Sequence, residues 1–278
     1  MSTDEPAIGS LVWATDIDVL ERNHVLARRD GYWVVRSPGN PTFWWGNFLL
    51  FDAPPDAGDR TRWESLFAAE FEDWPTVTHC TLAWDRTDGE TGAAAEFTSG
   101  GYKLERSTGL IAAPASLHAH PRANPEVTVR ALAAGPGADE DLWEQVIAVQ
   151  TAEPFDDAPP EYHRAFLLRR QAGLRELFRD GRGCWFVALD GDQVVASLGV
   201  VVTGGRARYQ AVDTLPSHRR RGIASRLVYE AAQLTLRAHP IDRFVIVADP
   251  EYHAIGIYQS LGFEPIETVS GVMRTPPR

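Results

Sequence analysis

A short basic turn that contains a glycine is the segment of this sequence best suited to bind a phosphate group. It reads Arg219-Arg220-Arg221-Gly222-Ile223-Ala224-Ser225 and joins an expected strand to an expected helix. The first turn of a helix leaves backbone N–H groups without intrahelical partners, and the helix dipole makes that end positive. A glycine lets a phosphate approach the backbone, and the arginines add positive charge. The same pattern is also compatible with a solvated basic cap on an amphipathic helix.

The elements on either side of this turn predict a mixed α/β fold for the second half of the chain. Apolar residues recur at helical spacing after the turn, at Ile223, Leu227, Ala231 and Leu234. The Asp190-Gly191 pair between two apolar runs indicates a β-hairpin. The expected order is a strand at Val127–Leu132, helices at Asp139–Thr151 and Pro160–Arg179, strands at Cys184–Leu189, Gln193–Val202 and Arg206–Leu215, a helix at Gly222–Ala238, a strand at Arg243–Ala248, a helix at Glu251–Leu261 and a final pair of strands within Phe263–Arg274.

Two segments of this half carry short motifs in a fixed order. The first, Arg219-x-x-Gly222-x-Ala224, follows a strand and opens a helix. The second is Ala254-Ile255-Gly256-Ile257-Tyr258-Gln259-Ser260-Leu261-Gly262-Phe263, at the end of the last expected helix. They resemble the R/Q-x-x-G-x-G/A and A-x-x-L-Y-x-x-L-G-F motifs of the GNAT N-acetyltransferases. Glu251 departs from the family pattern, in which an Asn is common at that position.

The resemblance implies a GNAT acyl-CoA N-acyltransferase fold, with acetyl-CoA as co-substrate and no metal. It implies that backbone N–H groups from Arg220 to Ser225 bind the pyrophosphate. It also places the pantetheine arm along the end of the strand Arg206–Leu215. The residues expected to bind the coenzyme are Val212, Asp213, Thr214, Arg219, Arg220, Arg221, Gly222, Ile223, Ala224, Ser225 and Tyr258.

Acyl transfer to an amine in a ternary complex needs a proton donor for the leaving thiolate and a base for the amine. A tyrosine with a pKa near 10 can donate to a thiolate whose thiol titrates near 8.5, so Tyr258 is the expected general acid. Packing on an apolar helix face is its alternative role. Asp213 and Asp249, near the ends of neighbouring strands, are candidate bases, and each is equally compatible with a turn or capping role. His218 is expected to be a solvated member of the basic loop.

The first half contains neither motif and weakly resembles the degenerate partner domain of tandem GNAT proteins. A smaller α/β GNAT-like domain is therefore expected at residues 1–114, a proline-rich linker at 115–126 and the acetyltransferase domain at 127–278. Seven of the nine tryptophans fall in the first half, where core packing is favoured over a ligand cage. The expected elements are a helix at Asp16–Arg29, strands at Tyr32–Arg36 and Thr42–Phe51, a helix at Arg60–Glu72, a strand at Val77–Trp84 and a hairpin across Ala93–Ala112.

Composition restricts the class of protein and of partner. The net charge of −11 argues against a nucleic-acid binder that uses His218–Arg221, while it suits a cationic partner or serves solubility alone. No apolar run approaches the ~20 residues of a membrane span, and the N-terminus lacks the pattern of a signal peptide. Cys80 and Cys184 have no Cys or His partners at metal-binding spacing. A cytoplasmic protein with reduced thiols and no metal is expected.

The function expected from these residues is N-acetylation of a primary amine on a small molecule or peptide. A non-catalytic acyl-CoA-binding or sensor module is the alternative, because it needs the phosphate-binding turn but not Tyr258. Acceptor specificity is expected to come from Glu153–Arg164 and from the first half. The acceptor, the acyl-chain preference, any ligand of the first half and the oligomeric state are left open by the sequence.

Overall fold

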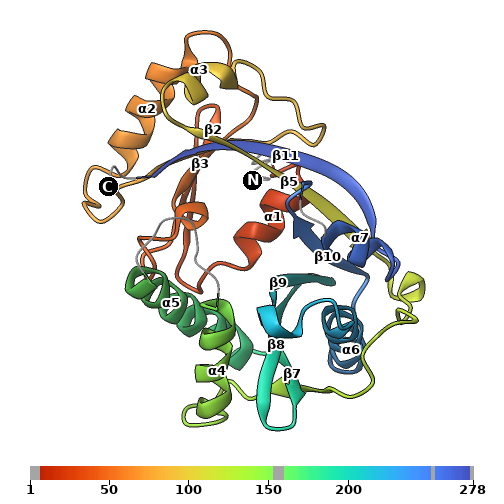
Figure 1. The fold of residues 1–278 in the computed structure, drawn as a ribbon. Coiled ribbons are helices and arrows are strands. Elements are labelled where there is room, and N and C mark those ends of the chain that lie inside the picture. The colour runs from red at the N-terminus through yellow and green to blue at the C-terminus, as the bar shows by residue number, and fades with distance from the viewer. Residues whose placement is uncertain (1–6, 153–159, 252–253, 276–278) are drawn as a thin grey trace, which may run out of the picture. The chain divides into compact units, whose positions relative to one another are not determined.

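The computed structural model describes residues 7–152, 160–251 and 254–275, drawn in colour in Figure 1. The chain divides into two compact units. Unit 1 comprises Met1–Gly109 and Ile266–Arg278, and unit 2 comprises Leu110–Pro265. The last segment is therefore grouped with unit 1, although it follows unit 2 along the chain. The expected boundaries at 114 and 126 stay a prediction about domains.

Unit 1 is built around a mixed sheet in the strand order β1-β2-β3-β4-β11-β5. Strands β3 and β4 are parallel and are connected through helix α2, while the pairs β1–β2, β2–β3 and β4–β11 are antiparallel. Its elements are α1 (Leu11–Asp18), β1 (Val25–Arg29), β2 (Tyr32–Arg36), η1 (Trp44–Gly46), β3 (Phe48–Phe51), α2 (Asp59–Glu70), β4 (Cys80–Trp84), α3 (Ala94–Ser99), β5 (Lys103–Ala112) and β11 (Glu264–Arg274), of which the last residues of β5 and the first of β11 belong to unit 2.

Aromatic side chains fill the core of unit 1. The rings of Phe51 and Trp63 stack with centroids 3.6 Å apart, and Trp63 also packs against Trp84 and Phe97. Trp63 and Trp84 are both fully buried. Core packing therefore accounts for these tryptophans, as the sequence favoured.

Three expectations for the secondary structure of unit 1 were wrong. The span 16–29 is not one helix, because α1 ends at Asp18 and Val25–Arg29 pairs with β2 as an edge strand. The span 42–51 contains the 3-10 turn η1 before β3. The span 93–112 is not a hairpin but the short helix α3 followed by β5. In each case strand pairing or a short helix overrides the local propensity of the sequence.

Unit 2 contains the strand order β5-β10-β9-β8-β7-β6. Its elements follow the order expected from the sequence, and β11 is one continuous strand rather than the expected pair. They are η2 (Pro114–Ser116), β6 (Thr128–Leu132), α4 (Glu140–Gln150), α5 (Pro160–Arg179), β7 (Gly183–Asp190), β8 (Gln193–Thr203), β9 (Arg206–Thr214), η3 (Pro216–His218), α6 (Ile223–Ala238), β10 (Arg243–Ala248) and α7 (Ala254–Gln259).

Helices cover both faces of the sheet of unit 2, with α4 and α5 on one face and α6 on the other (Figure 1). Side chains of β7 alternate between these faces, as they must in a strand. Trp185 lies with its ring centroid 6.0 Å from that of Trp143 in α4. Its neighbour Phe186 belongs to the core cluster that contains Leu227 of α6.

Strands β9 and β10 are parallel and separate toward their C-terminal ends. Their pairing joins Arg206–Arg208 to Arg243–Val245, and it does not extend further among the described residues. A β-bulge also interrupts the pairing of β9 with β8, where the register shifts between Ser197 and Gly199. Ala211 lies in this bulge with a φ of 44°, a left-handed conformation that is unusual for alanine. Asp213 and Thr214 still pair with β8, so it is the side of β9 toward β10 that has no strand partner at this end among the described residues.

Within the described part of the chain, no helix has both the length and the apolar character needed to cross a membrane.

Candidate functional site

Unit 2 contains a cavity of about 1070 Å³ next to the end of β9. Four segments of the chain supply its wall: the end of β9, the turn that leads into α6, helix α7, and the segment that precedes β6. The lining residues are His120, Arg122, Val212, Asp213, Thr214, His218, Arg219, Arg220, Arg221, Gly222, Ile223, Ala224, Ser225, Ala254, Gly256, Ile257, Tyr258 and Ser260. All the residues expected to bind the coenzyme are in this set.

The basic turn before α6 has a backbone conformation suited to holding an anion. Arg220 and Gly222 have φ values of 59° and 75°, and Gly222 is the residue that precedes the first turn of α6. Turns that contain left-handed residues can direct successive backbone N–H groups toward one point. The apolar residues Ile223 and Leu227 anchor α6 in the core behind the turn. The turn therefore offers backbone donors and arginine side chains to the same cavity.

The side chain of Arg219 joins this turn to the end of β9. Its Nε donates a hydrogen bond to the carbonyl oxygen of Thr214 over 3.2 Å. The bond links the end of the strand to the turn that precedes α6.

The structure adds a second reason for a glycine at position 222. A Cβ on Gly222 would overlap the carbonyl oxygen of Arg122 and would lie 3.1 Å from the backbone nitrogen of Asn124. The space freed by the missing side chain is thus taken by the segment 122–124. The positive φ and this close packing require the glycine here, whereas the sequence argument attributed it to the approach of a phosphate.

Tyr258 is a buried residue of the cavity wall. It lies on α7, is 6 % exposed, and its ring centroid is 6.3 Å from that of Phe263. A second tyrosine, Tyr209, lies in the same core but is fully buried, and its hydroxyl donates to the carbonyl of Val228 over 2.9 Å. Burial raises the pKa of Tyr209, so this hydroxyl is a structural donor. Of the two, only Tyr258 lines the cavity.

The two candidate bases occupy different environments. Asp213 lines the cavity and pairs in the sheet opposite Ser197, so its side chain is on the face that α4 covers. Asp249 is exposed, is not among the residues that line the cavity, and accepts a hydrogen bond from the N–H of Glu251 over 2.8 Å. Asp249 therefore has the capping role that the sequence left open for both residues.

Sequence reasoning missed two residues of the cavity wall, His120 and Arg122, because they lie in the segment expected to be a linker. It also described His218 as solvated, yet this side chain is 14 % exposed. His218 lies between the hydroxyl of Ser217, at 2.9 Å, and the carboxylate of Asp190, at 3.5 Å. No sequence pattern marks these positions, because only the fold brings them to the turn.

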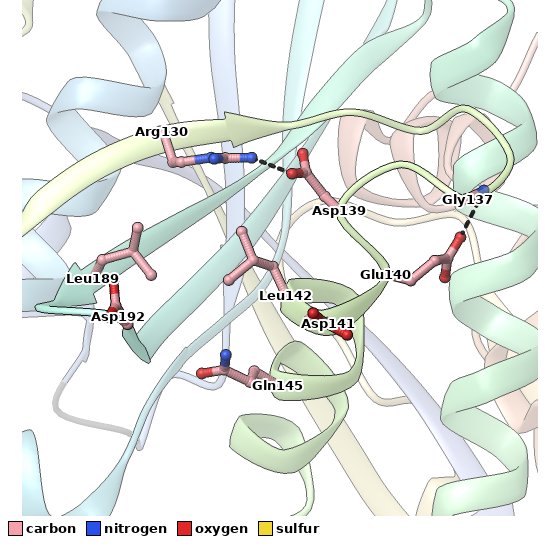
Figure 2. Close-up of a pocket in the computed structure, with 9 residues that line it drawn as sticks. All are labelled: Arg130, Gly137, Asp139, Glu140, Asp141, Leu142, Gln145, Leu189 and Asp192. Atoms are coloured by element: carbon pink, nitrogen blue, oxygen red, sulfur yellow. Dashed lines mark hydrogen bonds and ion pairs between the residues drawn. The ribbon is translucent and has the colours of Figure 1, made fainter.

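A second cavity in unit 2, of about 500 Å³, has an acidic wall (Figure 2). Two of its carboxylates already form ion pairs with arginines of the protein. Asp139 accepts from the N–H of Ala133 and from Arg130, which lowers its pKa, and Glu140 pairs with Arg175 over 2.6 Å, which lowers its pKa. These ion pairs fasten the start of α4 to its neighbours. The cavity has the wrong charge for a phosphate-bearing ligand.

A family model matches the part of the chain that contains the basic turn and Tyr258. Residues 143–263 match the model of the acetyltransferase (GNAT) family. This region is a GNAT acetyltransferase domain. It contains α4 to α7, the basic turn and Tyr258. No curated protein matches the chain.

Solved structures extend the GNAT fold over nearly the whole chain. A GCN5-related N-acetyltransferase from Kribbella flavida has a TM-score of 0.60 at 18% identity and covers 95% of this chain and 93% of its own. A tandem GNAT protein from the clavulanic acid biosynthesis pathway has a TM-score of 0.53 at 16% identity, with coverages of 94% and 89%. A functionally unknown protein from Staphylococcus epidermidis has a TM-score of 0.72 at 11% identity, with coverages of 92% and 95%. The chain is a tandem arrangement of two GNAT-like α/β units.

Within unit 1, the order β3-α2-β4-α3-β5 repeats the order β9-α6-β10-α7-β11 found later in the chain. The residue before α2 is Gly58, with a φ of 86°, as Gly222 is before α6. Here a carboxylate of the protein itself occupies the helix N-terminus. The N–H of Gly58 donates to both carboxylate oxygens of Glu96, over 3.0 and 3.2 Å.

The position of Tyr258 also has an equivalent in unit 1, and it is a phenylalanine. The N–H of Tyr102 bonds to the carbonyl of Phe97 over 3.1 Å, as that of Phe263 bonds to the carbonyl of Tyr258 over 3.2 Å. In both cases a glycine with positive φ precedes the donor. Phe97 has no hydroxyl and is fully buried. Unit 1 thus repeats the local fold without the groups that the GNAT domain offers to its cavity.

Proposed function

We propose that the chain is an acetyl-CoA-dependent N-acetyltransferase that transfers an acetyl group to a primary amine. The observation that carries the proposal is one cavity lined jointly by the end of β9, the basic turn and Tyr258. A phosphate-binding turn alone would be compatible with any nucleotide, and a buried tyrosine alone would be explained by core packing. Their presence in the wall of one cavity, within a GNAT domain, supports acyl transfer.

The basic turn fits the pyrophosphate of the coenzyme. Backbone N–H groups at the start of α6 and the arginines at 219–221 provide donors and positive charge, which an anion needs. The end of β9, from Val212 to Thr214, lies beyond the residues that pair with β10, and we assign it to the amides of the pantetheine arm. The volume of about 1070 Å³ accommodates a ligand of this size.

We propose that the acetyl group is transferred by direct attack of the acceptor amine on the thioester. The neutral amine nitrogen attacks the thioester carbonyl carbon, the C–S bond breaks, and the electron pair goes to sulfur. Tyr258 donates its proton to the departing thiolate. The proton of the acceptor nitrogen goes to Asp213 directly or through water. Because the register of Asp213 directs its side chain to the face that α4 covers, we assign that face to the acceptor.

Asp213 is the better of the two candidate bases. It lines the cavity, whereas Asp249 caps a turn at the end of β10. An alkylamine with a pKa near 10.4 is mostly charged at neutral pH, so the base must accept a proton before or during attack. The segment 153–164, to which the sequence assigned acceptor specificity, lies partly outside the described residues.

The test of the proposed function has a binding step and a chemical step. Calorimetry with acetyl-CoA should give saturable binding, and a panel of primary amines should include one that releases the free thiol of coenzyme A when it is added. Binding without thiol release for any amine would favour the acyl-CoA sensor. No binding of acetyl-CoA would contradict both.

A further inference from the structure

The segment 116–124, between β5 and β6, is fastened to both sequence motifs of the GNAT domain, and we call it the strap. The N–H of His118 donates to the carbonyl of Leu261 over 3.2 Å. At the other end, the N–H of Asn124 donates to the carbonyl of Gly222 over 3.1 Å. Gly222 and Gly262 both leave room for the strap, because a Cβ on either would overlap a strap carbonyl. The strap is therefore part of the wall that holds the basic turn in place.

Asn124 strengthens the attachment at the turn. Its side-chain Nδ2 donates to the carbonyl of Arg221 over 3.1 Å, and its Oδ1 accepts from the N–H of Glu126 over 2.9 Å. The residue is 8 % exposed, so these bonds are shielded from water. The strap therefore binds two carbonyl groups of the turn, those of Arg221 and Gly222.

Between its two attachments the strap presents His120 and Arg122 to the cavity. The N–H of Arg122 donates to Nδ1 of His120 over 3.0 Å, and the N–H of Ala123 donates to the carbonyl of His120 over 2.9 Å. Because Nδ1 accepts, the neutral ring carries its hydrogen on Nε2, which is a donor in either protonation state. His120 thus provides a donor next to the guanidinium of Arg122.

The charge of this wall is opposite to that of the chain as a whole. The net charge is −11, yet the lining residues include four arginines, at 122 and 219–221, and one acid, Asp213. No carboxylate of the described residues forms an ion pair with Arg122. A cationic wall in an acidic protein indicates an anionic ligand, and several arginines indicate more than one negative group.

We propose that the strap is part of the coenzyme site and that Arg122 and His120 bind a phosphate of coenzyme A. The proposal rests on the proposed function. The turn at 220–225 provides N–H donors for the pyrophosphate, so the strap residues are available for the 3′-phosphate on the ribose. Both groups have phosphate chemistry, and removal of the 3′-phosphate distinguishes them.

The test compares the full-length Arg122→Ala variant with Arg243→Ala, which removes an exposed arginine of unit 2 that is not part of the cavity wall. Calorimetry is done with acetyl-CoA and with its 3′-dephospho form, at low and at high salt. Because Arg122 is exposed, we expect its loss to weaken acetyl-CoA binding about 3- to 10-fold, with a smaller effect at high salt. Arg243→Ala should bind like the wild type.

Each outcome decides the proposal. A loss for acetyl-CoA but not for the dephospho form assigns Arg122 to the 3′-phosphate, and an equal loss for both assigns it to the pyrophosphate. An Arg122→Ala variant that binds acetyl-CoA as tightly as the wild type at low salt overturns the proposal. Failure of the wild type itself to bind acetyl-CoA would instead refute the proposed function, so the two failures are distinguishable.

Discussion

The guanidinium of Arg219 is bonded through Nε to the carbonyl oxygen of Thr214, at 3.2 Å, and so links the last residue of β9 to the basic turn. If Arg219 only supplied charge, the backbone alone would connect β9 to the basic turn. Here the side chain that brings positive charge to the cavity also bonds the turn to the end of β9.

The Arg219→Ala variant should therefore lose acetyl-CoA affinity by about 10-fold, since a charged donor and a positioning bond are removed together. Calorimetry measures this loss. The matched control is Arg226→Ala, in the first turn of α6, where the arginine pairs with Glu230 over 3.1 Å. Equal affinities of the two variants would show that the link between Arg219 and Thr214 has no role in binding.

Replacement of Tyr258 by Phe should lower turnover about 10²-fold and leave acetyl-CoA affinity nearly unchanged, because the ring still packs against Phe263 while the proton donor is lost. Steady-state rates and calorimetry on the same preparation measure both effects. Tyr229→Phe, a change of the same kind on α6 outside the cavity wall, should keep the wild-type rate. A wild-type rate in Tyr258→Phe would reduce Tyr258 to a packing residue.

The Asp213→Asn variant should be slow at neutral pH and recover as the pH rises, because a larger fraction of the acceptor amine is then already neutral. The pH profile of kcat/KM between pH 7 and 10 measures this recovery. Asp249→Asn should follow the wild-type profile, since its carboxylate caps a turn. If instead Asp249→Asn shows the slow profile, the assignment of the base is reversed.

The Gly222→Ala variant should be less stable than the wild type by more than about 1 kcal/mol, because the new Cβ would overlap the carbonyl of Arg122 at a positive φ. Denaturant unfolding measures the difference. Gly256→Ala is the control, since its Cβ would meet no atom within 4 Å and the position is helical. That change should be neutral or stabilise by about 0.5–1 kcal/mol. Equal stability of Gly222→Ala and the wild type would contradict the close packing of the strap.

Each chain should bind one molecule of acetyl-CoA. In unit 1 the carboxylate of Glu96 holds the N–H of Gly58 at the start of α2, and Phe97 stands in the place of Tyr258. A phosphate at that helix N-terminus would meet a negative charge. The stoichiometry from calorimetry of the full chain checks this expectation. Two sites of similar affinity would show that unit 1 retains coenzyme binding.

The sequence predicted the structure best in short segments whose residues determine both the local fold and the expected chemistry. The basic turn, the apolar period of α6 and the segment around Tyr258 could be read directly, because their spacing reflects contacts within a few turns of the chain. The Asp190-Gly191 hairpin was equally local, and β7 and β8 pair around it as expected.

Other features depend on contacts between distant segments and left no local pattern. Val25–Arg29 has the residues of a helix end but pairs with β2 as a strand. His120 and Arg122 lie among prolines and have no periodic neighbours, and only the bonds of the strap to Leu261 and Gly222 bring them to the cavity. The bulge at Ala211 shifts the register by one residue, so that Asp213 rather than Val212 lies opposite Ser197, and a single sequence does not encode this shift visibly.

Strand β11 has a consequence for the order in which the protein acquires its structure during synthesis. Ser270–Arg274 pairs with Cys80–Trp84, and Val272 lies in the aromatic core of unit 1. The ribosome makes this strand only after the whole of unit 2. Until then, one edge of β4 is unpaired and part of the core formed by residues 1–109 is uncovered. An open strand edge is a site for wrong pairing with other chains. Unit 1, although translated first, is therefore completed last.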